Sequence, residues 1–334
     1  MAAPRFETLD EVEYGRVDQV ADGIRRVIAE NPSKFTYRGT GTYIIGNGDV
    51  LVVDPGPVLD SHREALSVAL AGERVRGILI THCHSDHSPL AAWMRTETGA
   101  PTFAFGPHGA VDDEDDGDDS DGSDGDGSDG DGSDGDGSDG DAEEIDDGVK
   151  IEETIDVDFV PDVALADGEQ IAVGPGLTVT AVHTPGHTSN HMCYALAEPS
   201  VLFTGDHVMG WSTTVVSPPD GDMADYIESL RKVAGRRDAM LVPTHGPPRR
   251  DGPEFVAALV EHRLDRERQV IDAVRRGVDA IPAMVAELYA DVPVELHKPA
   301  GRSVLAHLVK LVRDGDAAVA DGGRPRLRSR YLPA

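Results

Sequence analysis

Three histidines and one aspartate fall within six residues of this chain, in the stretch Thr81-His82-Cys83-His84-Ser85-Asp86-His87. Imidazole and carboxylate groups together suit zinc, and iron or manganese also accept them. The cluster directly follows residues 75–80, an apolar run that predicts a β-strand. A strand that ends in such a cluster presents its ligands from one short loop. Only 13 of the 334 residues are histidines, so chance is a poor explanation and we expect a metal site here.

Three segments further along the chain repeat this arrangement, because each places a histidine or an aspartate just after a β-like apolar run. Glycine or proline stands beside each candidate, which fits tight turns at strand ends where side chains converge. Four such segments in order predict one shared metal centre. The downstream candidates are His187, Asp206 and His245, after the runs at 177–182, 201–204 and 240–243.

This order of motifs resembles the metallo-β-lactamase superfamily over nearly all of residues 30–250, since His-x-His-x-Asp-His is the central motif of that family. The resemblance implies an α/β fold, an αββα sandwich with the metals at one edge. Segments 39–46 and 51–56 look like the first two strands of the family, and Asp54 would support the site from outside the ligand set. The implied ligands are His82, His84 and His187 for one ion, Asp86, His87 and His245 for the second, and Asp206 as the bridge between them.

Two positions narrow the branch of the superfamily. Position 84 is His rather than the Glu of flavodiiron oxygen reductases, and position 206 is Asp rather than the Cys of many antibiotic-degrading lactamases. The pattern therefore resembles the hydrolytic branch that includes glyoxalase II, RNase Z and related nucleases, and not a true lactamase.

The resemblance implies hydrolysis by a hydroxide held between two divalent ions, with zinc as the first candidate. Two ions about 3.5–4 Å apart share a water and lower its pKa to near neutrality, and one of them polarises a carbonyl or phosphoryl oxygen. Asp86 and Asp206 are the residues expected to act in catalysis, and Asp206 would fix the metal separation.

Five other residues near the motifs are expected outside the ligand set. His183, His191 and His207 are interpreted as supporting or surface histidines. Cys83 should face away from the metals as a small buried thiol if its histidine neighbours face them. Cys193 lies in an apolar run, and two isolated cysteines do not imply a disulfide.

The formal net charge of -31 is concentrated in one segment, since residues 112–147 hold 20 acidic and no basic groups. Without them the chain has 41 acidic and 30 basic groups, and this remaining acidity suits a halophile-like cytoplasm. Residues 122–141 are four copies of Gly-Ser-Asp-Gly-Asp with no apolar residue to enter a core. We expect a disordered acidic insert within a catalytic domain at residues 1–250.

A second unit is predicted at residues 251–334, with helices at 253–276, 281–289 and 303–312 and Gly315 as a stop signal. Residues 317–330 would then form a β-wing centred on Gly322-Gly323. This mostly helical order resembles the C-terminal winged-helix unit of the β-lactamase-like endoribonuclease group, a group that also contains hydrolases without an assigned substrate. The resemblance also rests on His262-Arg263, on Arg266-Glu267 and on segments 205–210 and 218–223.

The C-terminal unit is neutral, with 13 acidic and 13 basic groups. Its tail carries four alternating arginines, which an extended strand would show on one face. Such a row could follow a phosphate backbone. It could equally be a charged edge strand that deters aggregation, or part of a unit that only packs over the site. The four are Arg324, Arg326, Arg328 and Arg330.

Two substrate classes remain open: phosphodiesters of single-stranded RNA, and thioesters or esters of a small metabolite, as in glyoxalase II-like enzymes. A third reading is a mononuclear-iron persulfide dioxygenase, which metal content would separate from the other two. Residues 1–7 lack the apolar core of a signal peptide, and no stretch approaches the about 18 apolar residues needed to cross a membrane. We therefore expect a soluble, cytoplasmic protein without a membrane partner.

Overall fold

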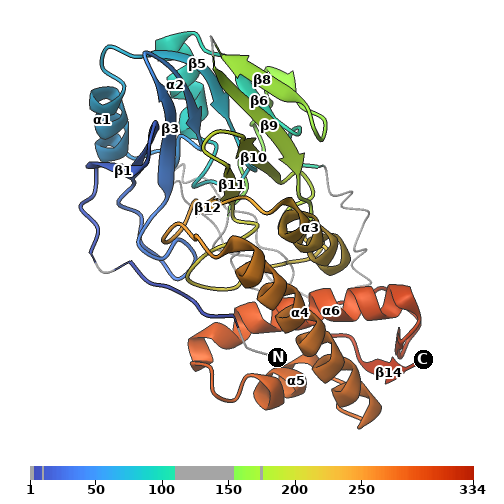
Figure 1. Cartoon of the computed structure of the whole chain (residues 1–334). Helices are drawn as coiled ribbons and strands as arrows, with labels where there is room; N and C mark the ends of the chain where they lie inside the picture. Colours follow the sequence, from blue (N-terminus) through green and yellow to red (C-terminus); the bar gives the residue numbers. More distant parts are fainter. Residues whose placement is uncertain (1–3, 10, 110–153, 174–175) are drawn as a thin grey trace, which may run out of the picture.

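Two β-sheets packed face to face form the centre of the computed structural model, which describes residues 4–9, 11–109, 154–173 and 176–334 (Figure 1). The first sheet has the strand order β1-β2-β3-β4-β5-β6-β7. Strands β1 to β4 pair antiparallel, and β4 to β7 pair parallel. The strands are β1 Val17–Ala21, β2 Ile24–Ile28, β3 Gly41–Asn47, β4 Asp49–Val53, β5 Arg74–Leu79, β6 Thr102–Ala104 and β7 Val163–Ala164.

The second sheet has the order β12-β11-β10-β9-β8, and all its pairs are antiparallel except β11 with β12. Its parallel pair places the ends of β11 and β12 at the same edge, so the residues that follow each strand come close together. The strands are β8 Gln170–Val173, β9 Leu177–His183, β10 Met192–Leu196, β11 Val201–Gly205 and β12 Met240–Pro243.

Apolar residues on both faces of the central strands explain the layered packing. In β4, Leu51 and Val53 face the second sheet, whereas Val50 and Val52 face the opposite way. Such near-continuous apolar strands are typical of a sheet that is covered on both sides. The helices that cover the first sheet are α1 (Asp60–Ala69) and α2 (Leu90–Thr98).

Helix α3 (Met223–Arg236) and the first half of α4 (Gly252–Arg275) cover the outer face of the second sheet. In Figure 1, α1 and α3 lie on opposite sides of the paired sheets. The layers are thus helix, sheet, sheet and helix, which confirms the expected αββα sandwich.

The C-terminal residues form a separate apolar core below the sandwich (Figure 1). Helix α4 belongs to both parts, because Phe255 packs against the second sheet and Val270 packs in the C-terminal core. The boundary predicted between residues 250 and 251 therefore lies at the start of a shared helix. The other C-terminal elements are α5 (Ile281–Leu288), η1 (Val294–Leu296), α6 (His297–Asp314), β13 (Ala317–Val319) and β14 (Tyr331–Pro333).

Two sequence predictions of element positions need correction. Strands β3 and β4 are not the first two of the sandwich, because β1 and β2 precede them. Helix α6 begins at His297 rather than at residue 303, and it includes Pro299 and Gly301. Proline is tolerated in the first turn of a helix, where its missing N–H group has no intrahelical partner to lose. Gly315 ends this helix with a φ of 80°, as predicted.

An antiparallel pair, β13 and β14, is present near the expected β-wing, but β14 begins at Tyr331, beyond the predicted range of 317–330. The arginine tail between the two strands is not one extended strand. The N–H of Ser329 donates to the carbonyl of Arg326 at 3.1 Å, so the segment turns there. All four arginines are exposed, and Arg330 forms an ion pair with Asp279 at 2.7 Å. The predicted acidic insert at residues 112–147 lies outside the described residues.

Among the described residues, no helix is long and apolar enough to span a lipid bilayer.

Packing between the two sheets makes a testable prediction about Phe203. This β11 side chain is 1% exposed and lies edge-on to the Tyr43 ring, with 5.5 Å between ring centroids. Replacing Phe203 with Ala should lower the free energy of unfolding by about 3–5 kcal/mol, because it leaves a cavity in the core. Chemical denaturation would measure this change. The control is Val68→Ala at a 76% exposed position of α1, which should change stability by less than about 0.5 kcal/mol. Equal effects of the two variants would contradict the packing described here.

Candidate metal centre

All seven predicted ligands lie at one edge of the paired sheets. The loop after β5 carries four of them, and β9, β11 and β12 lead to the other three. Each of the seven belongs to at least one of three groups whose ligand atoms lie within 4.8 Å of one another. The structure thus brings together residues that are up to 163 positions apart. The groups are His82, His84 and His187; His82, His87 and Asp206; and Asp86, His87 and His245.

The first three histidines point their ring nitrogens at one point. Nε2 of His82 lies 2.9 Å from Nδ1 of His84, and Nε2 of His187 lies 3.3 Å from the same atom. Donors around a tetrahedral zinc ion, each about 2.0–2.1 Å from the metal, come comparably close to one another. The spacing therefore fits a single small cation.

The group of Asp86, His87 and His245 also lies close to Asp206. Nε2 of His245 lies 3.2 Å from Oδ2 of Asp86 and 3.4 Å from Oδ2 of Asp206. Nε2 of His87 lies 3.3 Å from Oδ2 of Asp86 and 3.7 Å from Oδ1 of Asp206. Oδ2 of Asp206 also lies 4.0 Å from Nε2 of His187. The Asp206 carboxylate thus faces both groups, as a bridging ligand must.

Two buried polar atoms of this cluster have no hydrogen-bond partner, namely Nε2 of His87 and Oδ1 of Asp206. Buried polar groups in folded proteins nearly always have a partner, so unpaired atoms that face each other need an explanation. A divalent cation would satisfy both. The donor set of five imidazoles and two carboxylates fits such an ion.

The ring nitrogens that point away from the centre are held by acceptors from other elements. Nδ1 of His187 donates to the carbonyl of Val215 at 2.7 Å, and Nδ1 of His245 donates to the carbonyl of Gly39 at 3.2 Å. Nδ1 of His87 lies 2.9 Å from Oδ2 of Asp54. Such contacts fix the tautomer and the orientation of a ligating histidine.

Asp54 holds the motif loop as well as His87, as the resemblance implied. Its Oδ1 accepts from the N–H of Thr81 at 2.8 Å, and its Oδ2 accepts from the Thr81 hydroxyl at 2.8 Å and from the Thr244 hydroxyl at 3.2 Å. Asp54 is fully buried and has a φ of 48°, a left-handed conformation that aspartate adopts more readily than most residues.

The other histidines near the motifs have different roles, in line with the sequence interpretation. Nε2 of His191 accepts from the N–H of Asp206 at 3.2 Å, and its Nδ1 therefore donates to the hydroxyl of Thr184 at 2.9 Å. His183 stacks on Phe105 at 3.9 Å between ring centroids. His207 is buried against the Tyr226 ring, 5.1 Å away.

Both cysteines are buried and unpaired, as expected. The Asn190 amide donates to Sγ of Cys83 at 3.0 Å, but burial outweighs this contact and raises the pKa of the Cys83 thiol to about 11. Burial also raises the pKa of Cys193 to about 12. Neither thiol is a ready nucleophile at neutral pH.

Burial and neighbouring charges divide the histidines into two electrostatic classes. Burial, followed by the charges of neighbouring histidines, holds the pKa of His82 well below its usual value, and burial lowers the pKa of His84 to about 3. Burial also opposes charge on His245, but the Asp206 and Asp86 carboxylates outweigh it and raise its pKa to about 10. In His87 the carboxylates of Asp86, Asp206 and Asp54 likewise outweigh burial and raise the pKa.

Sequence reasoning missed several groups that hold the ligands. The Thr40 hydroxyl donates to Oδ2 of Asp86 at 2.8 Å, and Thr40 is in turn held by Asn31 through two bonds of 2.9 Å. The Val215 carbonyl, which holds His187, carries no side-chain signal at all. Threonine and asparagine are common loop residues, so no pattern in the sequence marks these two for this role.

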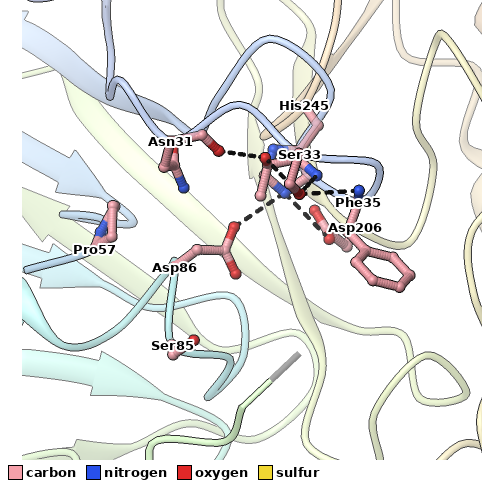
Figure 2. A pocket seen from close by; sticks show the side chains of 9 residues that line it. Asn31, Ser33, Phe35, Pro57, Ser85, Asp86, Asp206 and His245 are labelled. Atoms are coloured by element: carbon pink, nitrogen blue, oxygen red, sulfur yellow. Dashed lines mark hydrogen bonds and ion pairs between the residues drawn. The ribbon is translucent and has the colours of Figure 1, made fainter. Parts of the chain in front are cut away.

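A cavity of about 220 Å³ opens beside the second ligand group. Figure 2 shows the Asp86 and Asp206 carboxylates pointing toward His245 from different loops, with the Phe35 ring at the side. Segment 31–36 forms one wall of this cavity, and the Ser33 hydroxyl holds the turn by accepting from the N–H groups of Phe35 and Thr36 at 3.0 and 3.1 Å. The lining residues are Asn31, Ser33, Phe35, Thr36, Pro57, Ser85, Asp86, Asp206 and His245.

The contacts of Asp54 predict that it supports metal binding. Asp54→Asn replaces one carboxylate oxygen with an NH₂ group, which cannot accept from Thr81 or His87. We expect the affinity for metal to fall by about 10- to 100-fold, the usual loss for a group that orients a ligand. Competition with a chromogenic chelator would measure it. Asp49→Asn is the matched control, since Asp49 begins strand β4, which Asp54 directly follows, but pairs with Arg74 and Arg76. Unchanged affinity in Asp54→Asn would contradict this role.

The raised pKa values of His87 and His245 predict that metal uptake releases protons. In the metal-free protein at neutral pH both rings carry a proton, whereas a ligating histidine must be neutral. Filling their group should release about two protons, and the affinity should increase as the pH rises toward about 10, the pKa of His245. Calorimetry in buffers of different ionisation enthalpy would count these protons. Metal binding without proton release at neutral pH would be the opposite outcome.

Comparison with known proteins supports the fold of both parts of the chain. A curated relative, the "Beta-lactamase-like protein 2 homolog" of Caenorhabditis elegans, is 29% identical over 304 residues, covering 90% of this chain and 87% of the relative. An "Atrochrysone carboxyl ACP thioesterase" of Aspergillus chevalieri is 29% identical over 318 residues, covering 91% of this chain and 85% of the relative.

Two crystal structures share the fold across almost the whole chain. A "Beta-lactamase domain protein" from Burkholderia ambifaria has a TM-score of 0.69 at 21% identity and covers 97% of this chain and 96% of its own. A metallo-beta-lactamase family protein from Thermus thermophilus has a TM-score of 0.65 at 20% identity and covers 94% of this chain and 99% of its own.

Two family profiles match the two parts of the chain. Residues 280–324 match the "Beta-lactamase associated winged helix domain", which covers α5, α6 and β13. Residues 37–245 match the "Metallo-beta-lactamase superfamily", a span that contains all seven candidate ligands. The chain therefore belongs to the metallo-β-lactamase superfamily and is a hydrolase of that fold with a C-terminal winged-helix domain.

Proposed function

We propose that this chain hydrolyses acyl thioesters with the help of two divalent metal ions, and that zinc is the first metal to test. In this proposal His82, His84 and His187 hold one ion, and Asp86, His87 and His245 hold the other. Asp206 bridges them. When bound, the ions supply Lewis acidity toward the substrate carbonyl and an acidified water.

The side chains that line the 220 Å³ cavity are the main observation in favour of a thioester substrate. None of its nine lining residues is a lysine or an arginine. With Asp86, Asp206 and His245 engaged by the ions, the other lining residues offer a phosphodiester no cationic side chain to offset its charge, whereas a thioester is neutral and needs none. Phe35 and Pro57 offer apolar contacts beside the polar wall.

Cations lie on the same loop but are not among the lining residues. Nζ of Lys34 is 5.2 Å from the centre of the Phe35 ring, and the guanidinium of Arg38 is 5.3 Å from the centre of the Tyr37 ring. This arrangement fits a substrate whose negative charge is remote from the reacting carbonyl. An acyl group on a phosphopantetheine arm, as in acyl-coenzyme A or an acyl carrier protein, has that charge distribution.

The chain's own side chains would position the substrate and exclude water. The Thr40 hydroxyl occupies one lone pair of Asp86 Oδ2, which fixes the carboxylate at the cavity wall. The Phe35 ring forms the side of the cavity (Figure 2). Tyr37, two residues on, is stacked on Trp211 with 4.6 Å between ring centroids, which holds this loop against the segment that follows Asp206.

The names of several relatives support the same substrate class. Four of the similar curated proteins, at 26% to 29% identity, are named atrochrysone carboxyl ACP thioesterases. The hydrolysis of a thioester on an acyl carrier protein is thus associated with sequences that align over most of this chain.

A substrate panel tests the proposal. Protein loaded with zinc, manganese or iron would be assayed with acyl-coenzyme A, acyl-pantetheine and acyl-glutathione thioesters, and in parallel with labelled single-stranded RNA. We expect metal-dependent release of free thiol, which Asp206→Ala abolishes because it removes the bridging carboxylate. Asp162→Ala is the control, since Asp162 pairs with Arg95 away from the site. RNA cleavage without thioester hydrolysis would overturn the proposal, and a single iron with oxygen consumption would point to a dioxygenase.

A further inference from the structure

A buried arginine of the shared helix α4 reaches the segment that follows Asp206. Arg263 is 4% exposed. One end of its guanidinium donates to the carbonyl of Thr214, and Nη1 donates to the hydroxyl of Ser303 at 3.5 Å. The guanidinium also lies over the Tyr226 ring, 5.2 Å from its centre. These partners are a carbonyl, a hydroxyl and a ring, and none of them carries a negative charge.

The carbonyl that Arg263 holds belongs to a segment that touches two of the candidate ligands. The Thr214 hydroxyl donates to the main-chain carbonyl of Asp206 at 2.6 Å and to that of His207 at 3.1 Å. The next residue, Val215, accepts the Nδ1 proton of His187 at 2.7 Å. Thr214 and Val215 therefore connect the backbone of Asp206 with the ring of His187.

Thr214 and Val215 belong to the segment of residues 206–222, which connects β11 to α3 and contains no helix or strand. Its position depends on contacts with other elements. Arg263 of α4 is not the only contact, because Arg302 of the winged-helix domain also reaches this segment. Its Nη1 lies 3.4 Å from the hydroxyl of Ser217. Burying a guanidinium is costly, and no carboxylate within the described parts of the chain pairs with Arg263, so its contacts with this segment must offset that cost.

We propose that Arg263 is a positioning residue of the metal centre. By holding the Thr214 carbonyl it keeps Thr214 and Val215 in the place from which they orient Asp206 and His187. Helix α4, which links the two domains, thereby contributes to metal binding without touching the ions. This inference rests on the proposed metal-dependent function, but it concerns metal affinity and holds for any substrate.

Arg263→Ala tests the proposal, with Arg266→Ala as the matched control. Arg266 lies one turn further along α4 and makes the same kinds of contact, with a carbonyl at 2.8 Å and a tyrosine ring at 4.1 Å, but its partners Leu288 and Tyr289 belong to the C-terminal domain. We expect Arg263→Ala to weaken metal binding by about 10- to 100-fold in chelator competition, as is usual for groups that orient ligands. Arg266→Ala should bind metal like the wild type.

The kinetic readout separates positioning from substrate binding. With whichever substrate the wild-type protein turns over, Arg263→Ala at saturating metal should lower kcat more than it changes KM. Added guanidinium ion at a non-denaturing concentration should restore part of the metal affinity of Arg263→Ala by entering the vacated space. It should have no effect on Arg266→Ala.

Other variants keep the proposal testable if Arg263→Ala folds poorly. Arg263→Lys retains the charge and one donor, so its metal affinity should lie between those of Arg263→Ala and wild type. Thr214→Val keeps the shape of the side chain but removes the bond to Asp206, and it should also weaken metal binding. Wild-type metal affinity in folded Arg263 variants or in Thr214→Val would overturn the proposal. If the wild-type protein binds metal but hydrolyses no thioester, only the proposed substrate fails, because the affinity comparison remains valid.

Discussion

Two neighbouring carboxylates, buried Asp206 and partly buried Asp86, set the conditions that the rest of this structure meets. A buried carboxylate is strongly unfavourable unless cations or hydrogen-bond donors surround it. Here five imidazoles face the pair, and three of them lie within 4.0 Å of Asp206. Burial opposes the ionisation of Asp86, but His87 and His245 outweigh it and hold its pKa well below the usual range. The negative charge of the two carboxylates is thus balanced by protons on His87 and His245, and a divalent cation can replace those protons.

The convergence of the seven candidate ligands could be predicted from the sequence, because they follow apolar strands and the strand ends of one sandwich meet at one edge. The groups that orient the ligands could not. The Thr40 hydroxyl and the Val215 carbonyl reach Asp86 and His187 across 46 and 28 positions of the chain, and neither residue type stands out in a loop. The same limit applies to Arg263, which the sequence singled out only through the resemblance of the C-terminal unit and which proves to be buried against the site segment.

In the C-terminal domain, local sequence patterns predicted some helix and strand positions correctly and others wrongly, for physical reasons. Periodicity located α4 and α5, and Gly315 marked the end of α6. The start of α6 was placed too late because Pro299 and Gly301 disfavour a helix interior, although Pro299 lies in the first turn, where its cost is small. Alternation of the tail arginines suggested one extended strand, but a turn that is stabilised by Ser329 interrupts it. Turn hydrogen bonds of this kind have no periodicity to detect.

Different parts of the chain control the ligand positions, the cavity wall and the orientation of the centre. The sandwich fixes where the ligands emerge, and it does so through strands that are covered on both faces. The segment around Phe35 shapes the cavity, whereas the segment around Thr214 touches the ligands from the side of the winged-helix domain. The contacts that orient His187 and the Asp206 backbone lie on a different loop from Phe35, so a residue that only lines the cavity can change without removing them. Asn31 is different, because it lines the cavity and also holds Thr40, which bonds Asp86. The separation of Phe35 from the orienting contacts explains in physical terms how one ligand motif can serve hydrolases with different substrates.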